Sequence, residues 1–124
     1  DTNGHVIPEF YEDGSSSDFI NYNTFYLNDC PNLEQIKGLK NVTNIMALDF
    51  SNCVNLTSLE GLEKMLDLRE IDLTDCTNLE SIHALKNCSK LEKILAFRCN
   101  KLSPKPKVKN MDTIEKVQEY LAKL

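Results

Sequence analysis

The sequence predicts an α/β solenoid, in which successive coils each contribute one short strand to a shared sheet. The first observation is a cysteine that recurs at an unbroken spacing of 23 residues, at Cys30, Cys53, Cys76 and Cys99. The second is a leucine three residues after each cysteine, and the third is a set of apolar or aromatic residues eight, five and three positions before it. A fixed period of this length indicates one supersecondary unit per copy, stacked so that each copy covers its neighbour's apolar face.

Two apolar periods alternate within each copy. Before the cysteine the period is two, as in Ile71-x-Leu73, which predicts a short strand with one buried face. After the cysteine the period becomes three. In the second copy it runs through Leu56, Leu59, Leu62, Met65 and Leu68. A period of three indicates a tight 3₁₀-like or short helical return on the far side of the coil.

The pattern L-x-x-I-x-L-x-x-C-x-x-L over residues 68–79 resembles the leucine-rich repeat, in the variant with cysteine where asparagine is commoner. The resemblance covers roughly residues 19–114. It implies a curved solenoid with a short parallel β-sheet on the concave face and 3₁₀ or short helical returns on the convex side, and it implies no particular partner. The fourth copy departs from the pattern, because Ala96 and Lys105 occupy apolar columns. The pattern therefore does not determine where the solenoid ends.

Composition shifts divide the chain into four expected segments. They are an N-terminal cap and loop at 1–18, the repeats at 19–102, a linker at 103–110 and a C-terminal helix at 111–124. The prolines and lysines of the linker predict a stiff segment that cannot continue the sheet. The first residues, Asp1 to Gly4, weakly resemble a calcium loop, but the bidentate glutamate of such a loop is out of place.

The C-terminal helix is predicted from its capping and its periodicity. Asp112 and Glu115 have the spacing of a capping box, and apolar residues recur on one helical face. These are Ile114, Val117, Leu121 and Leu124. We expect this stripe to cap the last coil rather than to bind a partner.

Length and composition exclude several classes of function. With 124 residues and 41% hydrophobic content the chain forms one domain with a continuous core. A net charge of −5 argues against nucleic-acid binding, and no apolar run approaches the ~20 residues of a membrane span. The chain has no initiator Met and no signal-peptide pattern, so we expect it to begin inside a longer precursor or after processing.

The five cysteines predict core packing rather than a disulfide framework or a zinc site. Four form one column of the repeat, and Cys88 falls in the column of Met65. Side chains of stacked strands run parallel, which is the wrong direction for bridging, and no close C-x₂₋₄-C pair is present to bind zinc. Buried unpaired cysteines favour an intracellular, reducing compartment.

No set of residues predicts catalysis or a cofactor. His5 and His83 fall in different parts of the chain, and no Gly-rich phosphate loop or His/carboxylate metal set is present. We therefore predict that the chain is not an enzyme and carries neither a metal nor a cofactor. It remains open whether it is the recognition arm of a larger enzyme.

Register assigns the candidate binding residues, because strand residues that alternate with the buried ones face the inside of the curve. The predicted partner-binding residues are Tyr26, Asp49, Glu70, Asp72, Lys93, Leu95, Phe97 and Arg98. Leu95 and Phe97 are apolar where earlier copies are mostly polar, so they form either an exposed contact site or, if the last strand slips, part of the core.

The leading hypothesis is a protein-interaction module that binds another polypeptide through the concave sheet face. The first alternative is the substrate-recognition segment of a larger enzyme, such as a ubiquitin ligase or a secreted effector. The second is a structural surface repeat. The identity of the partner and the oligomeric state do not follow from the sequence.

Overall fold

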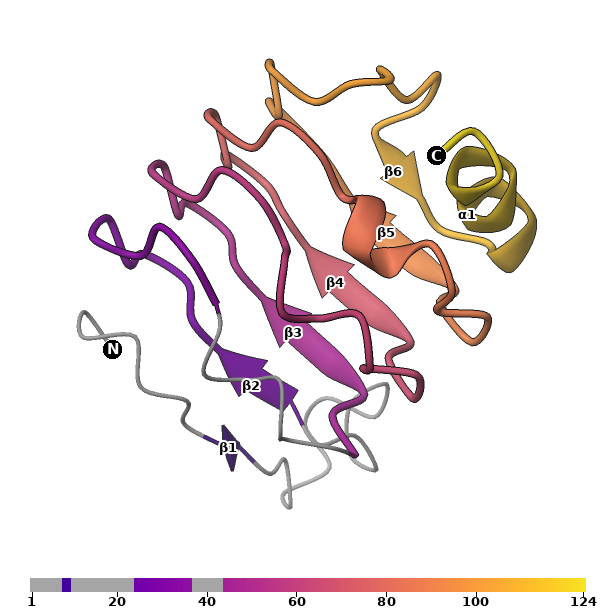
Figure 1. The fold of residues 1–124 in the computed structure, drawn as a ribbon, viewed down its shortest axis with the longest axis horizontal. Helices are drawn as coiled ribbons and strands as arrows, with labels where there is room; N and C mark the ends of the chain where they lie inside the picture. Colours follow the sequence, from indigo (N-terminus) through magenta and orange to yellow (C-terminus); the bar gives the residue numbers. More distant parts are fainter. Residues whose placement is uncertain (1–7, 10–23, 37–43) are drawn as a thin grey trace.

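The computed structural model describes residues 8–9, 24–36 and 44–124, and within them a six-stranded sheet forms the frame of the molecule. The strands follow chain order across the sheet (Figure 1). They are β1 (Pro8–Glu9), β2 (Thr24–Tyr26), β3 (Ala47–Asp49), β4 (Glu70–Asp72), β5 (Lys93–Leu95) and β6 (Asn110–Met111). Successive copies of the repeat therefore lie side by side, as expected of a solenoid.

Strands β2 to β5 are parallel and keep one register. Phe25 pairs with Leu48, Leu48 with Ile71, and Ile71 with Ile94, so each partner lies one sequence period further along the chain. The ladder continues beyond the strands, where the backbone N–H of Leu73 donates to the carbonyl of Leu95 at 2.8 Å. The constant sequence spacing thus becomes the constant register of the sheet.

The predicted core columns are buried. Phe50, Leu56, Leu73 and other residues of these columns have an exposed fraction of 0%, and Ala96 in the fourth copy has 2%. Phe25 and Leu33 of the first copy are partly buried and pack against the same cluster. The small side chain of Ala96 therefore leaves the buried register of the fourth copy intact.

The cysteine column ties each coil to the one before it. Cys53 Sγ donates to the Leu27 carbonyl at 3.0 Å, Cys76 Sγ donates to the Phe50 carbonyl at 3.1 Å, and Cys99 makes the equivalent contact. All five thiols are free and buried, and burial raises the pKa of Cys53 and Cys99 to about 11. The prediction that these cysteines fill the core is confirmed.

The returns of the coils are built from tight turns. In the second copy the N–H groups of Cys53, Leu56, Leu62, Met65 and Leu68 each donate to the carbonyl three residues earlier. In the third copy the same bonding closes a 3₁₀ helix, η3 (His83–Leu85). A bond that spans three residues explains the apolar period of three, because every third side chain then points inward.

The linker prediction was wrong in one respect, because its last residue takes part in the sheet. Strand β6 pairs antiparallel with β5, with Met111 opposite Ile94, and the N–H of Ala96 donates to the Lys109 carbonyl at 2.7 Å. The prolines do end the parallel coils, since a proline lacks the N–H that a strand needs. The chain beyond them is free of proline, and it returns to satisfy the edge of β5.

The C-terminal helix is shorter than predicted and has a different N-cap. Helix α1 spans Ile114–Leu121, and the Thr113 side chain accepts a hydrogen bond from Lys116 N. The predicted capping box of Asp112 and Glu115 was therefore wrong. Asp112 lies one residue earlier and instead accepts a hydrogen bond from Lys116 Nζ at 2.8 Å. Because Met111 is held in β6, the helix cannot begin until the chain has left the sheet.

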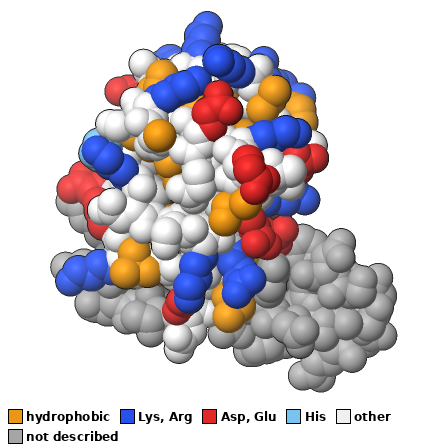
Figure 2. Space-filling view, turned by 90° about the vertical axis from the view of Figure 1, so that its right-hand side faces the viewer, with side chains coloured by type: hydrophobic (Ala, Val, Ile, Leu, Met, Phe, Trp, Pro, Cys, Tyr) orange, Lys and Arg blue, Asp and Glu red, His pale blue; other side chains and the backbone are white. Residues whose placement is uncertain are grey.

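Helix α1 packs beside β5 and β6 (Figure 1). It buries Val117, Tyr120 and Leu121, whereas Ile114, a member of the predicted stripe, is 40% exposed. The Tyr120 hydroxyl donates to the Pro104 carbonyl at 2.5 Å, which fastens the helix to the preceding segment. Figure 2 views this end of the molecule and shows acidic and basic side chains intermixed over it.

The expected N-terminal cap at 1–18 lies outside the described residues except for Pro8–Glu9. These two residues form β1, which pairs antiparallel with β2. A strand at this position could not be predicted from the sequence, because two residues carry no detectable periodicity.

Candidate functional site

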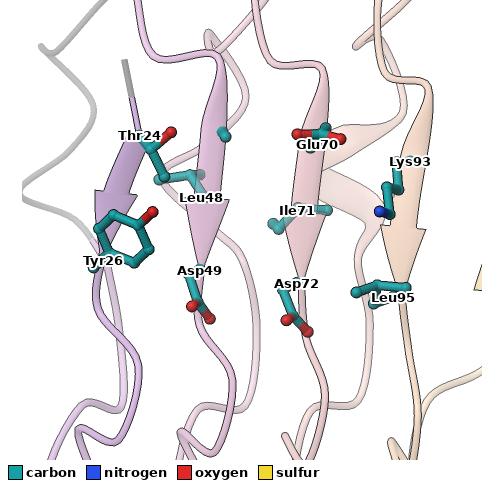
Figure 3. Close-up of a pocket in the computed structure, with 10 residues that line it drawn as sticks. Thr24, Tyr26, Leu48, Asp49, Glu70, Ile71, Asp72, Lys93 and Leu95 are labelled. Atoms are coloured by element: carbon teal, nitrogen blue, oxygen red, sulfur yellow. The ribbon is translucent and has the colours of Figure 1, made fainter. Parts of the chain in front are cut away.

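The sheet presents one face that does not carry the core columns, and we call it the hollowed sheet face. The first row across it comprises Thr24, Ala47, Glu70 and Lys93, and the second comprises Tyr26, Asp49, Asp72 and Leu95. Each row is held in register by the pairing of β2 to β5, so its members lie about one strand spacing, ~4.8 Å, apart. Figure 3 shows both rows.

A hollow of about 240 Å³ lies over these two rows. Its lining includes six of the eight predicted partner-binding residues. They are Tyr26, Asp49, Glu70, Asp72, Lys93 and Leu95. Phe97 and Arg98 follow β5 and lie outside its lining. The parallel register therefore brings most of the predicted residues, from four strands, into one depression.

Two carboxylates in the hollow have a local structural role that sequence reasoning missed. Asp49 Oδ1 accepts hydrogen bonds from Ser51 N at 2.9 Å and Ser51 Oγ at 2.6 Å, and Asp72 Oδ1 accepts one from Thr74 N at 2.9 Å. Aspartate commonly bonds in this way to the backbone two residues further on. These bonds orient both side chains at the ends of their strands and occupy one oxygen of each.

A ridge of residues with left-handed backbone conformation borders the sheet, one residue before each cysteine of the column. Asp29, Asn52, Asp75 and Arg98 have φ between 58° and 64°. Aspartate and asparagine tolerate this conformation well, and Arg98 is the exception in the fourth copy. Asn52 Nδ2 donates to Asp29 Oδ1 at 2.8 Å, so the side chains of neighbouring coils contact along the ridge.

The predicted binding residue Arg98 is already paired within the chain. Its Nε donates to Asp75 Oδ1, and its Nη2 donates to Asp75 Oδ2 at 3.2 Å. This contact lowers the pKa of Asp75 and raises the pKa of Arg98. Arg98 therefore belongs to the ridge, and part of its guanidinium is already engaged by Asp75.

The last parallel strand keeps its register, so the slipped arrangement of β5 is wrong. Leu95 pairs with Asp72, Ala96 is buried, and Phe97 is 37% exposed. Leu95 is half-buried at the end of the hollow. Both apolar side chains therefore lie outside the core of the solenoid, as the unslipped register predicts.

One further feature of the hollow could not be read from the sequence. Thr24 is only 3% exposed, and within the part of the chain that the structure describes its hydroxyl has no hydrogen-bond partner. Register had placed Thr24 on this face without marking it as a binding residue. The sequence does not show that this hydroxyl is buried without a partner, because that depends on which residues pack around it in the fold.

The described residues form neither a metal cluster nor a helix that could span a membrane. In residues 8–9, 24–36 and 44–124, no group of three His, Cys, Asp or Glu side chains is placed to hold a metal ion. No helix in the same ranges is long and apolar enough to cross a membrane.

Comparison with known proteins identifies the family. The family model described as "BspA type Leucine rich repeat region (6 copies)" matches residues 16–121, which is most of the chain and extends beyond the four cysteine-marked copies. No curated protein and no solved structure gives a significant match. The repeat period, the stacked parallel strands and this match agree, and the chain belongs to the leucine-rich repeat family of the BspA type.

Proposed function

We propose that this chain is a protein-interaction module that binds a polypeptide partner on the hollowed sheet face, which forms the concave side of the solenoid. Repeats of this family generally mediate protein–protein interactions or serve as surface repeats. The observation that carries the proposal is the hollow itself, which gathers aromatic, apolar and charged side chains from four successive strands. Leu95, which is half-buried, and Phe97, which is 37% exposed, give this surface an apolar end that a partner could contact.

The C-terminal end of the solenoid has a capping role rather than a binding role in this proposal. Strand β6 and helix α1 cap the last coil, because they cover the edge of β5 and bury Val117 and Leu121 against the core. Capping leaves the hollowed sheet face as the surface for recognition. A larger enzyme that contained this chain would use the same face to select its substrate.

Capture with matched variants tests the proposal. The double variant Leu95→Ser with Phe97→Ser removes the apolar end of the surface, and Leu66→Ser removes an apolar side chain that is 54% exposed and does not line the hollow. We expect proteins captured by the unaltered chain to be lost with the double variant and retained with Leu66→Ser. Equal capture by all three chains, at equal thermal stability, would place the binding surface elsewhere.

A further inference from the structure

Two carboxylates in the hollow form no ion pair with the described residues, unlike three other aspartates of the surface. Ion pairs join Asp67 to Lys90, Asp75 to Arg98 and Asp112 to Lys116. By contrast, the described part of the chain contains no ion pair to the two aspartates of the second row. Among the described residues, Lys93 on β5 is diagonally opposite Asp72 but forms no ion pair with it, so the pair keeps capacity for a further cation.

Geometry makes this pair a specific acceptor. Asp49 and Asp72 stand directly opposite each other on β3 and β4, about 4.8 Å apart by strand spacing. Figure 3 shows their carboxylates extending in the same direction. Each uses Oδ1 within its own turn, which leaves Oδ2 without a hydrogen bond from the described residues. Like charges directly opposite each other destabilise a sheet, and a cation placed between them would relieve the repulsion.

The best fit to two parallel acceptors is a guanidinium group. Its planar fork of N–H donors can bond two carboxylates at once, whereas an ammonium group acts as a single point charge. A hollow of about 240 Å³ is below the ~300–1,000 Å³ of most small-molecule sites. It is therefore better suited to a few side chains than to a metabolite.

The row that contains the pair also sets the spacing of the ligand. Tyr26 and Leu95 lie at its two ends, three strand spacings or ~14 Å apart, with Asp49 and Asp72 between them. In an extended peptide, residues four apart are separated by ~13 Å and point to the same side, as does the residue midway between them. Such a peptide laid across the strands would place apolar side chains on Tyr26 and Leu95 and an arginine over the aspartates.

A second, independent observation points to a polar ligand in the same hollow. Thr24 lines it with a side chain that is 3% exposed, and its hydroxyl has no hydrogen-bond partner among the described residues. A buried polar group without a partner is costly, and a backbone group of a bound peptide would satisfy it.

We propose that the hollowed sheet face binds an extended segment of a partner protein in which an arginine is flanked, two positions away on each side, by apolar residues. This inference rests on the proposed function and specifies the chemistry of its partner. The arginine bonds Asp49 and Asp72, and the flanking residues contact Tyr26 and Leu95.

Fluorescence anisotropy with a synthetic probe tests the proposal. The probe is the amidated peptide Ser-Leu-Ser-Arg-Ser-Leu-Ser labelled with fluorescein. The first control peptide carries glutamine in place of arginine, and the second has the same composition with the arginine beside one leucine. We expect the probe to bind and both controls to bind at least about tenfold more weakly, because a bidentate charged contact is lost or misplaced.

Matched protein variants assign the contact. Asp49→Asn with Asp72→Asn keeps the Oδ1 acceptors of both turns and removes both charges, and Asp75→Asn removes one charge from the ridge outside the hollow. We expect at least about tenfold weaker probe binding for the first variant and little change for the second. Circular dichroism would verify that each variant is folded.

Three results would overturn the proposal: no binding of the probe, equal binding of the glutamine control, or unchanged binding by the aspartate variant. Saturable binding of calcium alone that this variant abolishes would overturn it too, by making the pair a metal site. The proposed function fails separately. If capture of natural partners needs Leu95 and Phe97 but tolerates the aspartate variant, the surface is correct and its occupant is not an arginine segment.

Discussion

Neutralising one aspartate of the hollow should stabilise the free protein. Asp72→Asn removes the repulsion between Asp72 and Asp49, which face each other on neighbouring strands. The substitution retains an Oδ1 atom to accept the Thr74 N–H, which lies 2.9 Å from Asp72 Oδ1. The backbone turn that follows β4 should therefore survive, and the change in stability should report mainly the charge.

The expected gain is small and has a defined sign. Two unit charges about 5 Å apart repel by about 0.8 kcal/mol in the dielectric of water, and like charges opposite each other in a sheet cost a similar amount. Part of this gain is offset because a neutral acceptor bonds Thr74 N more weakly than a carboxylate. Lys93, diagonally opposite on β5, also attracts Asp72. We expect a net stabilisation of about 0.5 kcal/mol.

Urea unfolding at two ionic strengths measures this gain. With an m value of about 1.5 kcal/mol/M, the midpoint should rise by about 0.3 M at about 0.01 M salt and return toward the unaltered value at about 1 M salt. The matched control Asp75→Asn removes the partner of Arg98 and should not raise the midpoint. A midpoint lowered by Asp72→Asn at both ionic strengths would refute the account of an uncompensated pair.

Three further predictions concern the core and the C-terminal end. Because burial raises the pKa of Cys53 and Cys99 to about 11, the unfolded chain loses these protons first as pH rises. The contribution of these thiols to the free energy of unfolding should therefore be constant below pH about 8.5 and fall between there and pH about 11, by up to about 1.4 kcal/mol per pH unit for each thiol, in urea titrations. A flat profile over this alkaline range would contradict the buried column. Tyr120→Phe removes the hydrogen bond to the Pro104 carbonyl and should cost about 1 kcal/mol in the same assay, whereas no loss would mean that the bond is not formed in solution. Deleting residues 113–124 removes the buried side chains of Val117, Tyr120 and Leu121, each worth about 1.5–3 kcal/mol, and exposes the apolar surface that they cover. The truncated chain should therefore aggregate in size-exclusion chromatography, and a monomer with an unchanged thermal midpoint would show that α1 is not a cap.

The repeat period accounts for most of what could be predicted from the sequence. A spacing of 23 residues places Phe25, Leu48 and Ile71 in one column, and the sheet uses the same spacing as its register. Alternation then determines which side chains lie in the core and which on the hollowed sheet face. Hence the burial of Cys76 and the position of Asp72 could both be predicted without coordinates.

Features that depend on one contact rather than on a repeated pattern could not be predicted. Strand β6 exists because the edge of β5 offers unpaired backbone groups, and two residues carry no period of their own. Asp112 has a suitable side chain, but Thr113 is the N-cap of α1 because Met111, immediately before Asp112, is held in the sheet. Likewise, Arg98 is a plausible binding residue by position, and only its distance to Asp75 reveals that it is already paired.

Thiol labelling of a single variant tests most directly which side chains of each strand face the core and which face the hollow. Thr74→Cys places a new thiol on the same face as Asp72, two residues before the native Cys76, which has an exposed fraction of 0% and a pKa raised by burial. The native protein would be treated with a thiol reagent at pH about 8, and modified positions would be followed by peptide mass spectrometry. We predict rapid modification at position 74 and none at Cys76 until urea is added. Equal rates at the two positions, or faster modification of Cys76, would contradict the assignment of core and binding face.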